Sequence, residues 1–270
     1  MSREANAISV LVRTFNSEKT LPRLLSALDL QSDDEIIAVD SGSTDGTLAV
    51  AEKFGAHIFN APPPFNYSKS LNIGFQASQN SWVLVISSHA IPLVPNLLSI
   101  LRTAAAKFPP DVVAGYGTNS IDLRQLEIDC QTIYYSAVDL PAVLSQCGNA
   151  NAIYRHAAWE AYAFDETLRT GEDHHWLANR AEQGFRFARI PAARTLNRNA
   201  YSLRYMFRKG FSEVSAHPHS PMTLHEAALI VGTLTKSLLF RGTSLSSYLR
   251  LMAHAGGRYA GSRRDLNNYH

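Results

Sequence analysis

VDSGSTDGT, at Val39–Thr47, is the stretch that decides the fold of this 270-residue chain. The apolar residues before it predict a buried strand at 36–39. After it, Thr44 or Asp45 can cap a helix that runs to Phe54. A strand ending in a carboxylate, a Ser/Gly-rich turn and a helix form one unit of an α/β fold.

The same order recurs on both sides of this unit. Apolar runs predict buried strands at 8–12, 57–59 and 82–86, and apolar periodicity predicts helices at 17–28 and 68–77. This alternation predicts an α/β fold with a mostly parallel, doubly wound sheet. Ligands bind such sheets beyond the carboxyl ends of the strands.

The second half of the chain is less regular. Helical patterns alternate with short strand patterns up to Pro191, and only helical patterns follow it. We expect helices at 93–108, 157–163 and 172–183, and strands at 112–116, 150–154 and 187–190. We therefore expect a core domain at 1–197 and a helical C-terminal extension at 198–270, with helices at 201–212, 224–240 and 245–254.

The composition, 46% hydrophobic and 18% charged, is typical of a globular protein. Residues 200–270 hold nine Lys/Arg and three acidic residues, which leaves about six positive charges there and about four negative charges on the rest. This asymmetry predicts a surface for anionic lipid or an acidic partner, or else a solvated helical face. The cysteines, Cys130 and Cys147, fit neither a disulfide framework nor a metal spacing, which favours a reducing compartment.

No apolar run reaches the ~18 residues that span a bilayer, and the N-terminus lacks the apolar region of a signal peptide. The sequence therefore predicts a cytoplasmic protein. Aromatic and basic residues interleave at 204–211, which suits a helix lying at the inner face of a membrane. The alternative is a helix that packs on the core or on a second copy of the chain in a homo-oligomer.

Four polar loops lie at the predicted ligand edge. An aspartate at a strand tip can accept hydrogen bonds from a ribose or a base, and Arg or Lys can bind a diphosphate. A turn that merely caps the next helix is the alternative for the second loop. The residues that carry the nucleotide-site hypothesis are Arg13, Thr14 and Asn16, then Asp40 and Ser41, then Lys69 and Asn72, and finally Ser88 and His89.

Four motifs occur in the order and spacing of the family-2 glycosyltransferases: VRTFN at 12–16, VDSGSTDGT at 39–47, NYSKSLNIG at 66–74 and GEDHHW at 171–176. Over about residues 7–195 the chain resembles this family, in particular the bacterial branch of rhamnosyltransferases and cell-surface polysaccharide enzymes. The resemblance implies a GT-A fold and a nucleoside-diphosphate sugar donor. It also implies transfer with inversion to a hydroxyl of a glycan or lipid-linked acceptor, and no nucleic-acid partner.

The resemblance assigns Asp40 to the nucleoside. It places Thr14 and Asn16 beside the nucleoside, and Lys69 and Asn72 near the base or the diphosphate.

The resemblance also assigns the acidic pair Glu172-Asp173 to the acceptor side, with Asp173 as the general base. Displacement at the anomeric carbon needs a carboxylate on the face opposite the leaving diphosphate. Acids that favour a helix N-terminus are the alternative. Trp176 either stacks on a sugar or fills the core. Asn149 belongs to a small-residue segment that resembles the strand leading into the acceptor site, although packing explains it equally well.

The chain departs from the family at the metal motif, because the slot Ser87–His89 contains no carboxylate. A neutral imidazole binds Mn²⁺ but is a poor ligand for Mg²⁺. His89 can hold a transition metal, or cations such as Arg13, Lys69 and Arg198 can replace the metal, or the site is degenerate. We favour a weak or unusual dependence on Mn²⁺ or Mg²⁺. The rival hypothesis is a non-catalytic nucleotide-sugar-binding protein; a dinucleotide oxidoreductase lacks its glycine motif.

Overall fold

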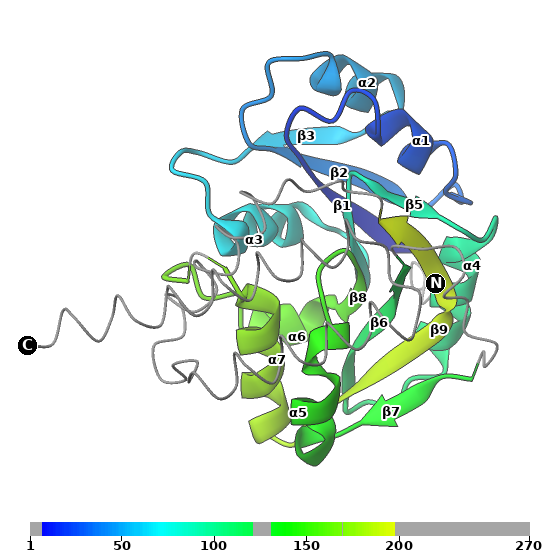
Figure 1. Ribbon diagram of the computed structural model, residues 1–270, viewed down its shortest axis with the longest axis vertical. Coiled ribbons are helices and arrows are strands. Elements are labelled where there is room, and N and C mark those ends of the chain that lie inside the picture. The colour runs from blue at the N-terminus through cyan, green and yellow to red at the C-terminus, as the bar shows by residue number, and fades with distance from the viewer. Residues whose placement is uncertain (1–6, 121–130, 169, 198–270) are drawn as a thin grey trace, which may run out of the picture. The chain divides into compact units, whose positions relative to one another are not determined.

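The computed structural model describes residues 7–120, 131–168 and 170–197, and nine strands in these ranges form one sheet (Figure 1). The strand order is β3-β2-β1-β4-β8-β6-β9-β5, and β7 pairs with β9. Helices and strands alternate along the chain, so the α/β class predicted from the sequence is confirmed.

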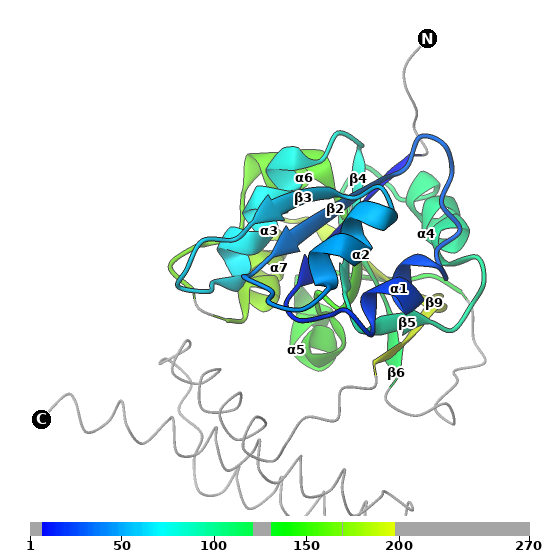
Figure 2. The same cartoon turned by 90° about the horizontal axis from the view of Figure 1, so that it is seen from above.

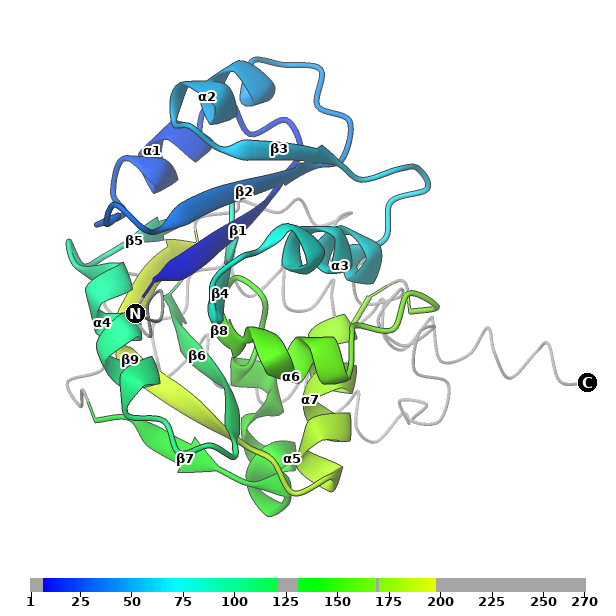
Figure 3. The same ribbon diagram turned by 180° about the vertical axis from the view of Figure 1, so that it is seen from behind.

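The first half of the sheet is parallel, as Figure 3 shows from behind. Its strands are β1 (Ile8–Thr14), β2 (Glu35–Asp40), β3 (His57–Asn60) and β4 (Trp82–Ser87). The connections contain α1 (Leu21–Leu25), α2 (Thr47–Lys53) and α3 (Tyr67–Ala77). All four strands were expected, and their carboxyl ends meet at one edge.

The second half of the sheet is mixed. β8 runs antiparallel to both β4 and β6, whereas β9 is parallel to β6 and antiparallel to β5 and β7. The strands are β5 (Ala90–Pro92), β6 (Val112–Ser120), β7 (Ile133–Tyr135), β8 (Asn151–Arg155) and β9 (Arg186–Asn197). The α-helices are α4 (Leu97–Ala106), α5 (Leu140–Val143), α6 (His156–Ala161) and α7 (Glu172–Glu182).

Apolar side chains are buried on both faces of the sheet. On β1, Val10 and Val12 face one core cluster and Leu11 faces the other. Helices α1, α2 and α4 cover the first face, and α3, α6 and α7 cover the second (Figure 2). A Cβ on Gly74 of α3 would clash with Leu11, so this helix packs directly on β1. Burial on both faces explains why the strands are continuous apolar runs.

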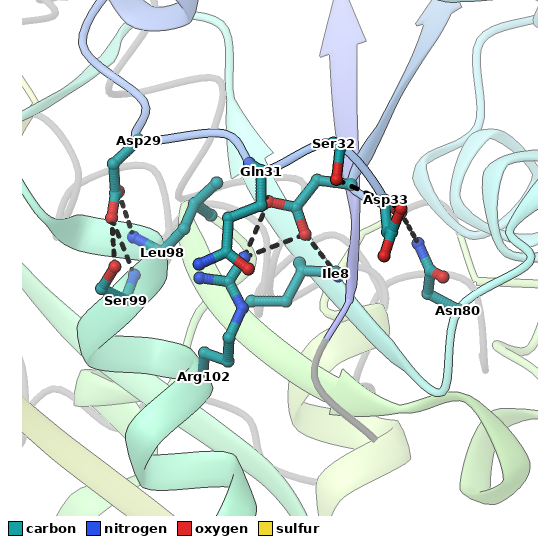
Figure 4. A network of polar contacts seen from close by, with 10 residues as sticks. Ile8, Asp29, Gln31, Ser32, Asp33, Asn80, Leu98, Ser99 and Arg102 are labelled. Carbon is teal, nitrogen blue, oxygen red and sulfur yellow. Dashed lines mark hydrogen bonds and ion pairs between the residues drawn. The ribbon is translucent and has the colours of Figure 1, made fainter. Parts of the chain in front are cut away.

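A polar network holds α4 at the amino edge of the sheet (Figure 4). Asp34, just before β2, has a fully buried side chain that forms a salt bridge with Arg102 of α4 at 2.7 Å. The same carboxylate accepts a hydrogen bond from the backbone N of Ile8 at 2.8 Å. Asp29 accepts one from the backbone N of Leu98, at the start of α4, at 2.7 Å. These contacts fix the edge opposite the strand ends that carry the polar loops.

Strand β9 is longer than the sequence predicted. We expected it to end before Pro191, because proline cannot donate a hydrogen bond to a neighbouring strand. The pairing instead passes from Gly117–Ile190 to Thr118–Arg194, so the proline lies in an irregularity of the ladder. Strands β5 and β7 were not predicted, since three residues are too few to establish the alternation of apolar and polar side chains in a strand.

Residues 198–270 lie outside the described ranges. The helices expected there and the domain boundary at 197/198 therefore stay predictions. Within the described part of the chain, no helix combines the length and the apolar character that crossing a bilayer requires.

Candidate active site

Asp40 lies at the carboxyl end of β2 and is only 2% exposed. The strand register places Thr14 beside it, and Thr14 Oγ1 donates to Asp40 Oδ1 at 2.8 Å. Ser43 Oγ donates to the same oxygen at 2.6 Å, and the backbone N atoms of Gly42 and Ser43 donate to Oδ2 at 2.9 and 2.7 Å. Burial opposes ionisation, but these hydrogen bonds outweigh it and hold the pKa of Asp40 below its usual value.

Each carboxylate oxygen of Asp40 thus accepts two hydrogen bonds from the protein. This geometry makes Asp40 the residue that shapes the following turn, and its contact with a nucleoside stays a prediction. Gly42 has a φ of 91°, a left-handed conformation that favours glycine. Ser41 is partly exposed, and its backbone N donates to Thr14 O at 3.0 Å.

Asn16 and Ser88 fasten neighbouring loops to one another. Asn16, with a φ of 46°, accepts a hydrogen bond at Oδ1 from Thr44 N at 2.9 Å. Its own backbone N donates to Ser43 Oγ at 2.8 Å. Ser88 Oγ lies 2.8 Å from Ser17 Oγ, and both residues are buried. The loops after β1, β2 and β4 therefore meet at the carboxyl edge, as predicted.

The amide of Asn72 is hydrogen-bonded within the protein, and its predicted place near the base or the diphosphate stays a prediction. Asn72 Oδ1 accepts hydrogen bonds from Trp159 Nε1 at 3.0 Å and Phe164 N at 3.1 Å. Its Nδ2 donates to Phe164 O at 2.9 Å and Glu166 Oε1 at 3.0 Å. These hydrogen bonds hold α3 to residues 164–166. Lys69, in the first turn of α3, has an exposed side chain, as a diphosphate ligand requires.

Glu172 and Asp173 begin α7. Glu172 is 5% exposed, and its Oε1 accepts a hydrogen bond from Asn149 Nδ2 at 3.1 Å. Asp173 Oδ2 accepts one from the backbone N of Asn149 at 3.2 Å, and Asp173 is partly exposed. Burial and the charge of Asp173 raise the pKa of Glu172, although Arg13 and Asn149 oppose the shift. Asp173 is therefore the acid of the pair that a substrate can reach.

Arg13 joins the polar loops to the acidic pair. It extends from β1, and its Nη1 lies 3.6 Å from Glu172 Oε1. Its guanidinium carbon lies 4.8 Å from the ring centre of Tyr67, a cation–π contact. The two groups of residues that the sequence assigned to donor and acceptor therefore meet at this guanidinium.

Trp176 is a core residue, so stacking on a sugar is ruled out. Its exposed fraction is 0%, and its Nε1 donates to Tyr162 O at 2.6 Å. The ring packs edge-on against Tyr154 at 5.2 Å between centroids. The core alternative left open by the sequence is the correct one.

The slot after β4 offers a divalent cation one imidazole and no carboxylate. Burial, with a contribution from the charge of Arg13, lowers the pKa of His89 from 6.5 to about 4, so the imidazole is neutral at pH 7. The Ser88 hydroxyl is already paired with Ser17. In the described ranges no three His, Cys, Asp or Glu side chains gather as a metal site would need. Mg²⁺ prefers oxygen ligands such as carboxylates, and none is present in Ser87–His89.

Because His89 is buried and neutral, we expect the protein to be less stable in mild acid than at pH 7. Between pH 6.5 and about 4 the unfolded chain binds a proton that folded His89 does not. The free energy of unfolding should therefore fall as the pH falls through this window, by up to about 1.4 kcal/mol per unit. Urea denaturation at pH 7 and pH 5 should show a smaller fall for His89→Gln than for the wild type. His57→Gln, on an exposed side chain of β3, is the control, and equal falls for all three proteins would contradict the buried neutral state.

The exposed aromatic side chains of the polar loops received no role in the sequence analysis. Phe15, directly after β1, is 60% exposed, and Phe65 is 47% exposed. Phe65 contacts Tyr67 edge-on at 4.6 Å, and Tyr67 in turn supports Arg13. The available signal was an aromatic residue inside a polar loop, which both the VRTFN and NYSKS motifs contain.

A profile of the family described as "Glycosyl transferase family 2" matches residues 9–127. The O-antigen chain rhamnosyltransferase RfbN of Salmonella typhimurium is 23% identical to this chain over 232 residues, which are 79% of this chain and 73% of that protein.

Two solved structures are similar in fold. The mannosyltransferase PcManGT from Pyrobaculum calidifontis, in complex with GDP-Man and Mn²⁺, has a TM-score of 0.65 and 16% identity, over 97% of this chain and 88% of that chain. Glucosyl-3-phosphoglycerate synthase from Mycobacterium tuberculosis, in complex with Mn²⁺, UDP and glucosyl-3-phosphoglycerate, has a TM-score of 0.59 and 18% identity, over 78% and 80% of the two chains.

The family match runs from β1 through β6 and so includes the polar loops that follow β1, β2 and β4. The solved structures agree with the α/β arrangement found here. The GT-A fold implied by the motifs is therefore confirmed. Residues 9–127 of this chain match glycosyl transferase family 2, which identifies this part of the chain as a glycosyltransferase sequence.

Proposed function

We propose that the chain transfers a sugar, with inversion, from a nucleoside-diphosphate donor to a hydroxyl of a glycan or lipid-linked acceptor. The observation that carries this proposal is the Arg13–Glu172 contact at 3.6 Å, which joins the loops of the carboxyl edge to the acidic pair. Transfer needs a cation that faces the diphosphate and a carboxylate that faces the acceptor. Arg13 brings these two parts together.

Asp173 is the general base of the proposed reaction. It takes the proton of the acceptor hydroxyl while the hydroxyl oxygen bonds to the anomeric carbon. The bond from that carbon to the diphosphate oxygen breaks, and the diphosphate leaves with the electron pair. Attack and departure on opposite faces invert the configuration. Glu172, buried against Arg13 and Asn149, orients Asp173 and is not the base.

The donor side consists of side chains that remain exposed or partly exposed at the loops. Arg13 and Lys69 offset the charge of the diphosphate, and neutral His89 donates an N–H to it. The open ring of Phe15 offers a face to the base. The presence of GDP-Man and UDP in the two similar structures supports a nucleotide-sugar donor.

The acceptor side is supported by the Salmonella relative, which is an O-antigen chain rhamnosyltransferase. We infer a role in bacterial surface polysaccharide synthesis, at the cytoplasmic face of the inner membrane. In this proposal residues 1–197 bind the donor and catalyse transfer. The basic extension at 198–270 brings the enzyme to its acceptor.

Protein groups, rather than a divalent ion, carry most of the diphosphate charge in this proposal. The support is the chemistry of the slot: neutral His89, paired Ser88 and the nearby Arg13 guanidinium. This departs from the two similar structures, both of which contain Mn²⁺.

The test is calorimetry with a panel of nucleoside diphosphates, paired with mass spectrometry of transfer products from the matching donors. One nucleoside diphosphate should bind, its sugar should be transferred, and EDTA should change both quantities by less than about threefold, or 0.7 kcal/mol. The His89→Asp variant places a carboxylate in the slot, so its affinity should respond to Mn²⁺.

Two results would contradict these proposals separately. Binding without hydrolysis or transfer, under every acceptor condition, would favour a non-catalytic nucleotide-sugar-binding protein. Transfer that EDTA abolishes and Mn²⁺ restores in the wild type would leave the transferase intact and overturn the metal-independent charge balance.

A further inference from the structure

We propose that Tyr154 is a positioning residue for transfer, and that it acts with Tyr116 through Asn149 to hold the acidic pair. This inference rests on the proposed function, because it concerns the geometry of the same base. Its basis is a continuous chain of buried hydrogen bonds that starts on β6, crosses β8 and ends at the first residues of α7.

Asn149 contacts both acids at once. Its backbone N donates to Asp173 Oδ2 at 3.2 Å, and its Nδ2 donates to Glu172 Oε1 at 3.1 Å. Its Oδ1 accepts a hydrogen bond from the Tyr154 hydroxyl at 2.6 Å. Asn149 is 4% exposed. A change in its rotamer would remove the hydrogen bond to Glu172, and a shift of its backbone would remove the one to Asp173.

The donors in this series of hydrogen bonds all point the same way, from Tyr116 towards Glu172. The Tyr154 hydroxyl donates its proton to Asn149 Oδ1, so the contact at 3.2 Å between the two tyrosine oxygens requires Tyr116 to donate to Tyr154. This order fixes the orientation of the Asn149 side-chain amide, whose NH₂ group donates to Glu172. The reverse orientation would point the amide oxygen at the carboxylate and remove a hydrogen bond from the ionised acid.

Aromatic packing fixes the Tyr154 ring. Its exposed fraction is 0%, and its centroid lies 5.8 Å from those of Phe75 and Phe164 and 5.2 Å from that of Trp176. The hydroxyl therefore has no room to find another partner. Burial raises the pKa of Tyr154 well above its usual value, with a further contribution from Asp173, so the hydroxyl stays a donor at working pH.

The pair needs such a support because burial and the neighbouring carboxylate both oppose the ionisation of Glu172. Among the described residues, Arg13 on β1 and Cys147 before β8 are ionisable groups that lie near it, and Arg189 on β9 acts in turn on Cys147. Burial and Asp173 raise the pKa of Cys147 to about 12, so the thiol is neutral. Arg13 and the Asn149 amide are thus the groups that stabilise the ionised pair from its buried side.

The test is Tyr154→Phe, which removes one hydroxyl and keeps the ring. We expect kcat to fall by roughly tenfold with an unchanged KM for the donor, since small displacements of a catalytic group affect turnover strongly. The acidic limb of the kcat–pH profile should move to higher pH, because the ionised pair loses a donor. Tyr116 is one hydrogen bond further from Asn149, so Tyr116→Phe should give smaller changes in the same directions.

Tyr135→Phe is the matched control, since its ring packs on Phe187 at 5.6 Å, outside the chain of hydrogen bonds. It should reproduce the wild-type kcat and pH profile. A lower melting temperature for Tyr154→Phe with an unmoved acidic limb would show a purely structural role and overturn the proposal. A carboxyl titration of the pair by ¹³C NMR makes the same comparison without turnover, so an inactive wild type would contradict only the proposed function.

Discussion

Replacing Asp173 with asparagine is expected to lower kcat for sugar transfer by about 10²- to 10⁴-fold, the usual contribution of a general base. The substitution is isosteric and keeps an oxygen that can accept the hydrogen bond from Asn149 N. Donor affinity should be unchanged, because Asp173 begins α7 whereas the proposed donor loops follow β1, β2 and β4. Steady-state kinetics and calorimetry with the nucleoside diphosphate measure the two quantities.

Asp111→Asn is the matched control for this experiment. Asp111 forms a salt bridge with Arg186 at 2.6 Å at the amino edge of the sheet, and its loss should leave kcat unchanged. Unchanged turnover in Asp173→Asn would remove the role of base from Asp173. A larger loss in Glu172→Gln than in Asp173→Asn would transfer that role to Glu172.

Replacing Asp40 with alanine is expected to weaken donor binding by about 100-fold or more and to lower the free energy of unfolding by about 2–4 kcal/mol. The loss leaves Thr14 Oγ1, Ser43 Oγ and two backbone N–H groups without their acceptor, and hydrogen bonds to a charged group are worth about 1.5–3 kcal/mol each. Thermal denaturation and calorimetry with the nucleoside diphosphate provide the measurements.

Asp40→Asn separates a loop-shaping role from a direct nucleoside contact. The amide NH₂ can donate to the hydroxyls of Thr14 and Ser43, because a hydroxyl also accepts, while the remaining oxygen accepts from the two backbone N–H groups. We therefore expect affinity within about fivefold of the wild type, or 1 kcal/mol. If asparagine is as damaging as alanine, the negative charge itself is required, and the nucleoside contact suggested by the family resemblance is favoured.

The parallel half of the sheet could be predicted because its strands are covered on both sides. Val10, Val83 and their neighbours form uninterrupted apolar runs, and polar residues begin where each run ends. Asp40 and the acidic pair were found in this way or by motif. Their positions depend only on short stretches of sequence.

The roles of Asn72 and Trp176 could not be predicted in the same way. Their partners are remote in sequence: Trp159 and Glu166 for Asn72, and Tyr154 for Trp176. The sequence of a polar motif does not show whether the amide of its asparagine binds a ligand or a distant loop of the protein. The Arg13–Glu172 contact is also long-range, so the link between the proposed donor and acceptor sides became visible only in the structure.

The salt bridge between buried Asp34 and Arg102 has an evolutionary consequence. It lies at the amino edge, where β1, β2 and α4 are tied together, while the proposed chemistry belongs to loops at the carboxyl edge. Substitutions that alter which sugar or acceptor is chosen can therefore accumulate in those loops without loosening the framework. A lineage built on this sheet is free to diversify its products while inheriting the same scaffold.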